Sequence, residues 1–254
     1  ILMGGFESVA KPWGDDAIPN EYHFGLLEPD WEHFKVFWEN AVHRVPAMEE
    51  AGINRFCVSA ESFTPDNRYL MGEAPEVKHF YLATGLNSTG IAAAPGVGKA
   101  VAEWIVNGAP TMDLWEVDIK RFHAFQSTKK YLYDRTIETV GTLYDKHYPH
   151  RQMESARGAR NSPLHDRLAN MGACFGEVAG FERPMWYAPR GHLPEYRYSF
   201  GRQNWFQYSA NEHQAVRETV GLFDQTSFGK FLLQGKDSES VAQQIFAGDL
   251  GVEP

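Results

Sequence analysis

The chain has 254 residues, of which 43% are hydrophobic and 14% aromatic, and its formal net charge is −9. This composition can fill the core of one or two domains. The negative charge, with no Lys/Arg cluster interleaved with aromatic residues, excludes a typical nucleic-acid footprint. No apolar run approaches the ~20 residues of a membrane-spanning helix. The two cysteines, Cys57 and Cys174, form neither a disulfide framework nor a zinc pattern.

The first predicted element is a helix over residues 30–45. Its apolar side chains recur at helical spacing, Asp30 is a suitable N-cap, and Pro46 ends the pattern. Aromatic residues at this spacing favour packing in a core over contact with a cofactor.

Short strands are predicted next, over residues 55–60, 69–71 and 80–84. A Thr-Pro-Asp-Asn sequence at residues 64–67 predicts a turn between the first two. Together these segments predict a β-rich surface.

A glycine-rich stretch follows the third strand and leads into a helix-like run over residues 100–106. It extends from Gly85 to Gly98, and Asn107-Gly108 ends the helix. Glycines bring the backbone close to a ligand, and a helix N-terminus offers free N–H groups and a positive dipole end. The order of strand, glycine loop and helix therefore predicts a site for an anion or a polar cofactor edge.

The stretch matches neither of two common phosphate-binding patterns. Ala93 stands where a P-loop has its first glycine, and Ala100 replaces the Ser or Thr. Val101 stands at the third glycine position of a dinucleotide fingerprint, and Pro95 interrupts the approach. Close helix packing in a tight turn remains an alternative, so the stretch alone names no ligand.

From residue 110 to about residue 160 the sequence is charged and aromatic, with few β-branched runs. This composition predicts a helical connector. His147 and His150 have a spacing seen in metal sites, but Pro149 between them disrupts helical geometry, so a solvated loop is the better prediction.

The last third predicts short helices and a strand. Ser162 caps a helix with Pro163 as its first residue, and a second helix runs over residues 211–221. A strand over 228–233 and a helix over 237–246 complete the chain.

Seven motifs occur along the chain in a fixed order. They are FTPD at 63–66, LMGEAP at 70–75, the stretch 85–98, DIKRF at 118–122, SPLHDRL at 162–168, GFERPMW at 180–186 and LFDQTSFGKF at 222–231. Together they resemble the dimethylglycine and sarcosine dehydrogenase family, which includes the regulatory subunit of pyruvate dehydrogenase phosphatase. Because family members are several times longer, the resemblance implies that the chain is an internal fragment.

The resemblance implies an α+β fold in three parts. Residues 1–108 are expected to be the C-terminal part of an FAD-dependent amine oxidoreductase domain, residues 109–160 a connector, and residues 161–254 the N-terminal part of an aminomethyltransferase-like, folate-binding domain.

The resemblance also implies FAD as cofactor, with the glycine stretch against the flavin ring. The implied cofactor-binding residues are Phe6, Gly85, Leu86, Asn87, Ser88, Thr89, Gly90 and Ile91. Phe6 stands where catalytic relatives often carry a tyrosine near the substrate, and it cannot donate a hydrogen bond. Ala92 stands where some amine oxidases place a basic residue that clamps the substrate carboxylate. No residue is assigned as catalytic, and Asp66 is expected to form a turn.

The function that the resemblance implies is oxidative demethylation of sarcosine or dimethylglycine, with transfer of the one-carbon unit to tetrahydrofolate. The partners expected are the N-methyl amine and, as one candidate electron acceptor, an electron-transfer flavoprotein. The expected location is the cytoplasm in a bacterium or the mitochondrial matrix in a eukaryote. The alternative is a non-catalytic regulatory subunit of the same architecture.

Overall fold

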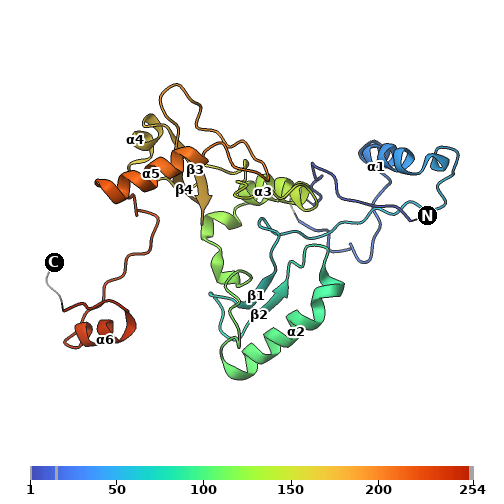
Figure 1. The fold of residues 1–254 in the computed structure, drawn as a ribbon. Coiled ribbons are helices and arrows are strands. Elements are labelled where there is room, and N and C mark those ends of the chain that lie inside the picture. Colours follow the sequence, from blue (N-terminus) through green and yellow to red (C-terminus); the bar gives the residue numbers. More distant parts are fainter. Residues whose placement is uncertain (1, 15–16, 252–254) are drawn as a thin grey trace.

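The computed structural model describes residues 2–14 and 17–251 and shows an α+β fold, as predicted (Figure 1). The α-helices are α1 (Trp31–Arg44), α2 (Gly90–Asn107), α3 (Lys129–Thr142), α4 (His165–Asn170), α5 (Phe206–Glu218) and α6 (Ser238–Ile245). Short 3₁₀ turns are η1 (Pro46–Met48), η2 (Ile119–Arg121) and η3 (Ala124–Ser127). The strands are β1 (Leu70–Glu73), β2 (Tyr81–Thr84), β3 (Ala173–Val178) and β4 (Phe181–Tyr187).

The first packed unit consists of the β1–β2 hairpin and α2, which lies along it (Figure 1). The strands are antiparallel, and Leu70 pairs with Thr84. Met71 on β1 packs against Val97 and Val101 on α2 to form a small buried core. This hairpin confirms the predicted strands at 69–71 and 80–84.

Helix α2 begins at Gly90, so the prediction that residues 90–98 form a loop is wrong. Pro95 and two further glycines lie inside the helix. Tertiary packing explains the difference, because a helix that buries an apolar face against a hairpin tolerates residues of poor intrinsic propensity. The predicted C-cap is confirmed, since Gly108 has the left-handed φ of 75°.

The N-terminal segment contains the predicted helix, now α1, in which the Asp30 side chain accepts from the His33 N–H at 3.0 Å. The predicted strand at 55–60 is wrong. Only one isolated bridge forms there, in which Leu27 N–H donates to the Val58 carbonyl at 2.8 Å. A single bridge offers no continuous partner for a strand ladder.

Helix α3 lies between the two hairpin units (Figure 1). It buries a stripe of residues one turn apart, namely Tyr131, Arg135 and Thr139. The connector is therefore helical only in part, and residues 143–164 are turns and irregular chain that include His147 and His150. Within the described ranges, no three His, Cys, Asp or Glu side chains gather as metal ligands would.

The second unit is the β3–β4 hairpin with α4 and α5. Its core consists of Cys174, Trp186 and Ala188. A two-residue turn joins the strands, with φ of 51° at Ala179 and 78° at Gly180, and this left-handed pair matches the twist of a tight hairpin. The sequence reading missed this hairpin.

Two helix boundaries differ from the predictions. Helix α5 begins at Phe206 rather than 211. Helix α4 begins at His165, and the Ser162 hydroxyl accepts from the Leu164 N–H in the turn just before the helix. The predicted strand at 228–233 is wrong, because no strand among the described residues pairs with it. Helix α6 confirms the prediction at 237–246, with Asp237 at its N-cap.

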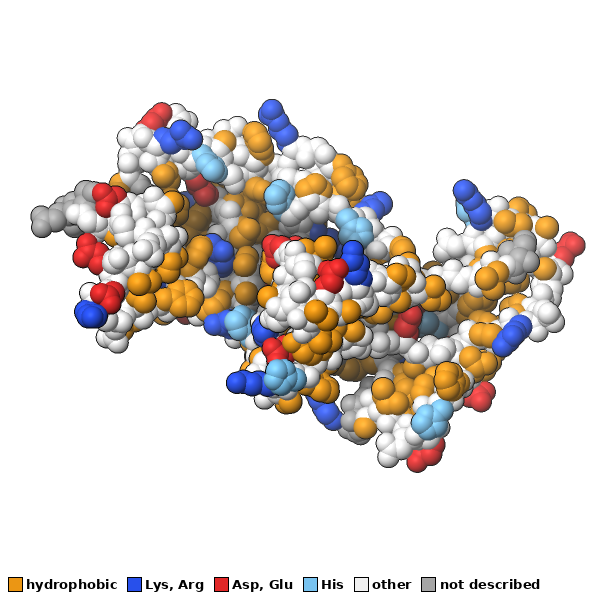
Figure 2. All heavy atoms as spheres, turned by 90° about the horizontal axis from the view of Figure 1, so that it is seen from below, with side chains coloured by type: hydrophobic (Ala, Val, Ile, Leu, Met, Phe, Trp, Pro, Cys, Tyr) orange, Lys and Arg blue, Asp and Glu red, His pale blue; other side chains and the backbone are white. Residues whose placement is uncertain are grey.

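The structure is open. It exposes 19036 Å² of surface, against about 11,000 Å² for a typical folded monomer of this mass. Figure 2 shows hydrophobic side chains on the face seen from below. Exposed apolar residues include Ile91 and Val106 on α2 and Leu222 and Phe231 beyond α5. Among residues 2–14 and 17–251, no helix has the length and apolar character needed to cross a bilayer.

Candidate functional site

The turn between β2 and α2, residues 85–89, has an unusual backbone. Three of its five residues have left-handed φ: 63° at Gly85, 46° at Asn87 and 66° at Ser88. A Cβ atom at Gly85 would lie 2.6 Å from the Thr64 side chain, so only glycine fits there. The turn therefore packs its backbone directly against the segment before β1.

The Asn87 side chain fixes this turn from inside. It is buried, and its Oδ1 accepts from the Thr64 N–H at 2.7 Å while its Nδ2 donates to the Gly85 carbonyl at 2.7 Å. Both ends of the amide are thus satisfied by backbone groups. The Asn87 side chain therefore holds the turn from within the protein, while the neighbouring Ser88 and Thr89 are exposed.

The N-terminus of α2 lies directly after the turn and has no side-chain cap. The hydroxyl of the N-cap residue, Thr89, donates to the Leu86 carbonyl at 2.7 Å and so is turned away from the helix. No acidic residue stands in the first turn. The N–H groups of Gly90, Ile91 and Ala92 have no intrahelical acceptor in an α-helix. This end of α2 can therefore accept an anion or a polar ring edge, which fits the polar edge of a flavin.

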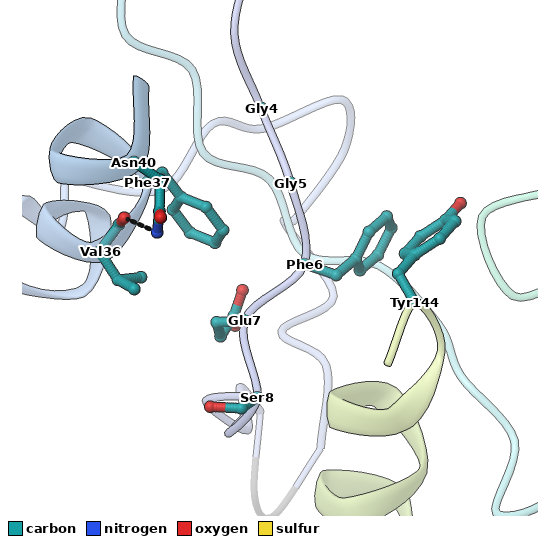
Figure 3. Close-up of a pocket in the computed structure, with 9 residues that line it drawn as sticks. All are labelled: Gly4, Gly5, Phe6, Glu7, Ser8, Val36, Phe37, Asn40 and Tyr144. Carbon is teal, nitrogen blue, oxygen red and sulfur yellow. Dashed lines mark hydrogen bonds between the residues drawn. The ribbon is translucent and has the colours of Figure 1, made fainter. Parts of the chain in front are cut away.

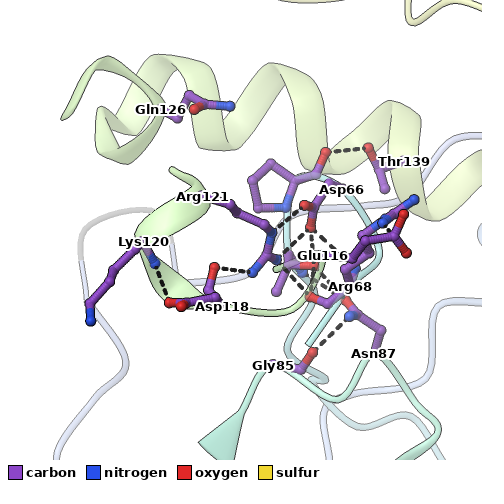
Figure 4. A network of polar contacts seen from close by, with 12 residues as sticks. Asp66, Arg68, Gly85, Asn87, Glu116, Asp118, Lys120, Arg121, Gln126 and Thr139 are labelled. Carbon is purple, nitrogen blue, oxygen red and sulfur yellow. Dashed lines mark hydrogen bonds and ion pairs between the residues drawn. The ribbon is translucent and has the colours of Figure 1, made fainter. Parts of the chain in front are cut away.

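A network of polar contacts supports the turn from the side of the connector (Figure 4). Arg121 binds Asp66 through two bonds, Nε to Oδ2 at 2.7 Å and Nη2 to Oδ1 at 3.0 Å. Thr139 on α3 donates to the Pro65 carbonyl at 2.9 Å. Asp66 is thus engaged within the turn at 64–67, as predicted.

A small cavity of about 260 Å³ lies beside the turn. It is lined by Asn67, Arg68, Tyr69, Asn87, Thr89, Glu116, Val117 and Leu143. Arg68 Nη1 and Glu116 Oε2 form an ion pair at 2.6 Å. Neither residue was predicted from the sequence to belong to the site, because no local sequence pattern relates Glu116 to the turn.

A larger open cavity of about 720 Å³ contains Phe6 (Figure 3). The centroid of the Phe6 ring lies 5.0 Å from that of the Tyr144 ring and 6.0 Å from that of the Phe63 ring. Phe63 immediately precedes Thr64, so the contact between the Phe6 and Phe63 rings links this cavity to the segment that packs against the turn. Of the predicted cofactor-binding residues, Phe6 thus lines the larger cavity, and Asn87 and Thr89 line the smaller one. Their contact with a cofactor stays a prediction.

Two ion pairs tie the β3–β4 hairpin to the preceding chain, and the motifs at 162–168 and 180–186 only partly indicate them. Arg157 Nε donates to Glu182 Oε1 at 2.8 Å, and the Gly158 N–H donates to the same oxygen at 2.7 Å. Burial raises the pKa of Glu182, but these hydrogen bonds outweigh it, so the pKa lies below its ordinary value. Arg135 on α3 pairs with Glu177 on β3. Both pairs hold the hairpin in place.

Three family models match the chain in succession. Residues 1–104 match the FAD dependent oxidoreductase domain, residues 107–162 the FAD dependent oxidoreductase central domain, and residues 164–254 the GCVT N-terminal domain. FAD is therefore the cofactor of the family to which the first two parts correspond.

Similar curated proteins align along the whole chain or nearly so. A 4-methylaminobutanoate oxidase (formaldehyde-forming) of Paenarthrobacter nicotinovorans is 46% identical over 100% of this chain and 31% of its own length. Human mitochondrial sarcosine dehydrogenase is 35% identical over 100% of the chain and 30% of its own length. The mouse mitochondrial pyruvate dehydrogenase phosphatase regulatory subunit is 35% identical over 99% of the chain and 29% of its own length.

The chain spans about a third of the length of these relatives. Mouse dimethylglycine dehydrogenase aligns in the same way, at 31% identity over 97% of the chain. With the three domain models in the same order, these matches show that the chain belongs to the dimethylglycine and sarcosine dehydrogenase family, in which an FAD-dependent oxidoreductase is joined to a GCVT-type domain.

Proposed function

We propose that the protein containing this chain is an FAD-dependent enzyme that oxidises the N-methyl group of an amino acid such as sarcosine or dimethylglycine. One observation carries the proposal: the uncapped N-terminus of α2 follows a turn that Asn87 holds in a left-handed conformation. This arrangement presents backbone N–H groups at a fixed place, as the polar edge of a flavin requires.

FAD would supply the hydride acceptor for the oxidation. The residues of this chain would position the flavin and stabilise its reduced form. The positive end of the α2 dipole favours the negative charge that accumulates when a flavin is reduced. Since the first turn of α2 has no carboxylate, no acidic side chain at that end of the helix opposes the charge.

The names of the relatives support a shared substrate class. 4-Methylaminobutanoate, sarcosine and dimethylglycine each combine an N-methylated amine with a carboxylate. The substrate is therefore proposed to be an N-methyl amino acid, with sarcosine and dimethylglycine as the first candidates.

Transfer of the one-carbon unit to tetrahydrofolate is a further part of the proposal. The match of residues 164–254 to the GCVT N-terminal domain supports it. The relative named as formaldehyde-forming provides the contrasting outcome. Measuring free formaldehyde with and without tetrahydrofolate distinguishes the two, because capture lowers the formaldehyde released per amine oxidised.

An electron-transfer flavoprotein is the proposed electron acceptor. The proposed location is the cytoplasm in a bacterium or the mitochondrial matrix in a eukaryote.

A regulatory subunit without catalysis is the second candidate. Two observations favour it: the 35% identity to the phosphatase regulatory subunit, and the absence of a hydroxyl group at Phe6. A tyrosine there can donate a hydrogen bond to a substrate, whereas phenylalanine keeps only the ring.

The test is anaerobic flavin absorbance of the full-length protein before and after adding sarcosine, dimethylglycine or 4-methylaminobutanoate. Bleaching by any of the three is expected, and the fastest identifies the preferred amine. Bound flavin that none of them bleaches would favour the regulatory candidate. A full-length protein that binds no flavin would refute the enzyme proposal.

A further inference from the structure

Two opposite charges line the smaller cavity, beside the turn at residues 85–89. The Arg68 side chain is 43% exposed and that of Glu116 is 56% exposed, and their ion pair measures 2.6 Å (Figure 4). Solvent-exposed ion pairs are held by only a small free energy. The Arg68 guanidinium can therefore exchange Glu116 for another carboxylate without leaving the cavity.

The backbone of Arg68, in contrast, is fixed on several sides. Its N–H donates to Asp66 Oδ1 at 3.1 Å, and its carbonyl accepts from the Thr64 hydroxyl at 2.9 Å and from Arg121 Nη2 at 3.2 Å. Thr64 also binds Asn87 through its N–H. Arg68 and the turn at 85–89 are thus anchored to the same residue, so the base of the Arg68 side chain keeps a fixed position relative to the turn.

Arg68 is the cation that this cavity offers. Among the residues lining it, Glu116 is the other charged group. The neighbouring Arg121 side chain is only 10% exposed and binds Asp66, and the Lys120 ammonium lies over the Trp104 ring. Ala92, on the first turn of α2, has no charge to offer. An anionic group entering the cavity therefore meets Arg68 first.

We propose that Arg68 binds the carboxylate of the N-methyl amino acid substrate, with Glu116 as the partner that the substrate displaces. This inference rests on the proposed function and names the residue that recognises its substrate. A guanidinium binds a carboxylate through two parallel hydrogen bonds, which sets the orientation of the ligand as well as its affinity. The cavity, at about 260 Å³, lies below the range of roughly 300–1,000 Å³ typical for drug-sized ligands and suits a small amino acid.

The first experiment compares an acid with its neutral amide on the full-length flavoprotein. Stopped-flow flavin reduction is measured with sarcosine and with N-methylglycinamide. For Arg68→Gln, the half-saturating sarcosine concentration should rise about tenfold to a hundredfold, while that of the amide stays within about twofold. Arg68→Lys should recover part of the loss, because it keeps the charge but not the paired geometry.

The Glu116→Gln variant should shift the half-saturating sarcosine concentration in the opposite direction. Removing the competing carboxylate frees the guanidinium, so sarcosine should saturate at a concentration several-fold lower than in the wild type. Arg217→Gln, at an exposed position on α5, is the matched control. It should leave the half-saturating concentrations of both sarcosine and the amide unchanged. If Arg68→Gln loses its flavin, Arg68→Lys and Glu116→Gln carry the test.

A second readout does not depend on turnover. Isothermal calorimetry with methoxyacetate, a carboxylate without an oxidisable amine, should show at least tenfold weaker binding to Arg68→Gln. If no amine bleaches the wild-type flavin, the proposed function fails while this measurement still tests Arg68. Equal weakening of acid and amide, or unchanged methoxyacetate affinity in Arg68→Gln, would overturn the assignment.

Discussion

Asn87 and Thr64, which are 23 residues apart in the sequence, bind each other in the interior of the oxidoreductase part of the chain. The Thr64 N–H donates to Asn87 Oδ1 at 2.7 Å, and each of the two residues is only 3% exposed. The same asparagine amide donates to the Gly85 carbonyl. The turn that faces the proposed flavin site is therefore held by one buried side chain.

Replacing Asn87 with alanine should destabilise the chain by about 2–4 kcal/mol. The change leaves the Thr64 N–H and the Gly85 carbonyl buried without these partners, and each such group costs about 1–3 kcal/mol. Alanine also disfavours the left-handed φ of 46°. Urea unfolding measures the effect. Ser88→Ala, at the exposed neighbouring position, should change stability by less than about 1 kcal/mol, and equal effects of the two variants would contradict the role given to the Asn87 side chain.

Gly72→Ala should be strongly destabilising, by about 2–4 kcal/mol. A Cβ atom there would lie 2.5 Å from the buried Trp104 ring, and the φ of 101° is unfavourable for any residue with a side chain. Gly98→Ala is the matched substitution within α2, where a Cβ atom would meet nothing within 4 Å. It should stabilise the helix by about 1 kcal/mol. Thermal unfolding of both variants checks the opposite signs.

Glu182→Gln should weaken the second unit in a pH-dependent way. The pKa of Glu182 is lowered from 4.5 in the folded chain, because its hydrogen bonds from Arg157 and Gly158 outweigh the effect of burial. The stabilisation is therefore fully present above pH 4.5 and is lost as the pH falls through the depressed folded value. The difference in melting temperature between wild type and Glu182→Gln should be largest near pH 7 and should shrink below pH 4.5. Glu239→Gln, at an exposed position on α6, should follow the wild-type curve, and a pH-independent difference for Glu182→Gln would refute the linkage.

The two cysteines should differ sharply in reactivity. Burial raises the pKa of the Cys174 thiol to about 11, and the residue is 3% exposed, whereas Cys57 is exposed. Iodoacetamide at pH 8 should label Cys57 and leave Cys174 unmodified, because only an accessible thiolate reacts. Peptide mass spectrometry of native and urea-unfolded samples gives the measurement. Rapid labelling of Cys174 in the native Cys57→Ser variant would show that the second unit opens readily.

Local sequence patterns predicted part of the fold correctly for physical reasons. Helix α1 and the β1–β2 hairpin follow from periodicity and turn residues, which act over a few neighbouring positions. The β3–β4 hairpin was missed although its Ala179-Gly180 turn is a usable signal. The predicted strand at 228–233 has the right composition, but a strand also needs a pairing partner, which composition does not supply.

The candidate site, like the fold, could be predicted from the sequence only in part. The sequence predicted the position of the turn at 85–89, because glycines mark backbone positions with special φ values. It did not predict that α2 begins at Gly90, since packing against the hairpin decides that. Nor did it predict the pairing of Arg68 with Glu116, which depends on how the segment after α2 returns past β1.

Helix α3 makes polar contacts both to the segment before β1 and to β3. Its Thr139 hydroxyl reaches the Pro65 carbonyl, while its Arg135 reaches Glu177 on β3. A protein engineer who separates the chain between residues 162 and 164, where one family model ends and the next begins, would leave Arg135 and Arg157 on one fragment and their carboxylates on the other. Because an unpaired buried charge is strongly destabilising, neither fragment should express as a stable module, and any division of labour between two polypeptides would have to keep α3 and the β3–β4 hairpin together.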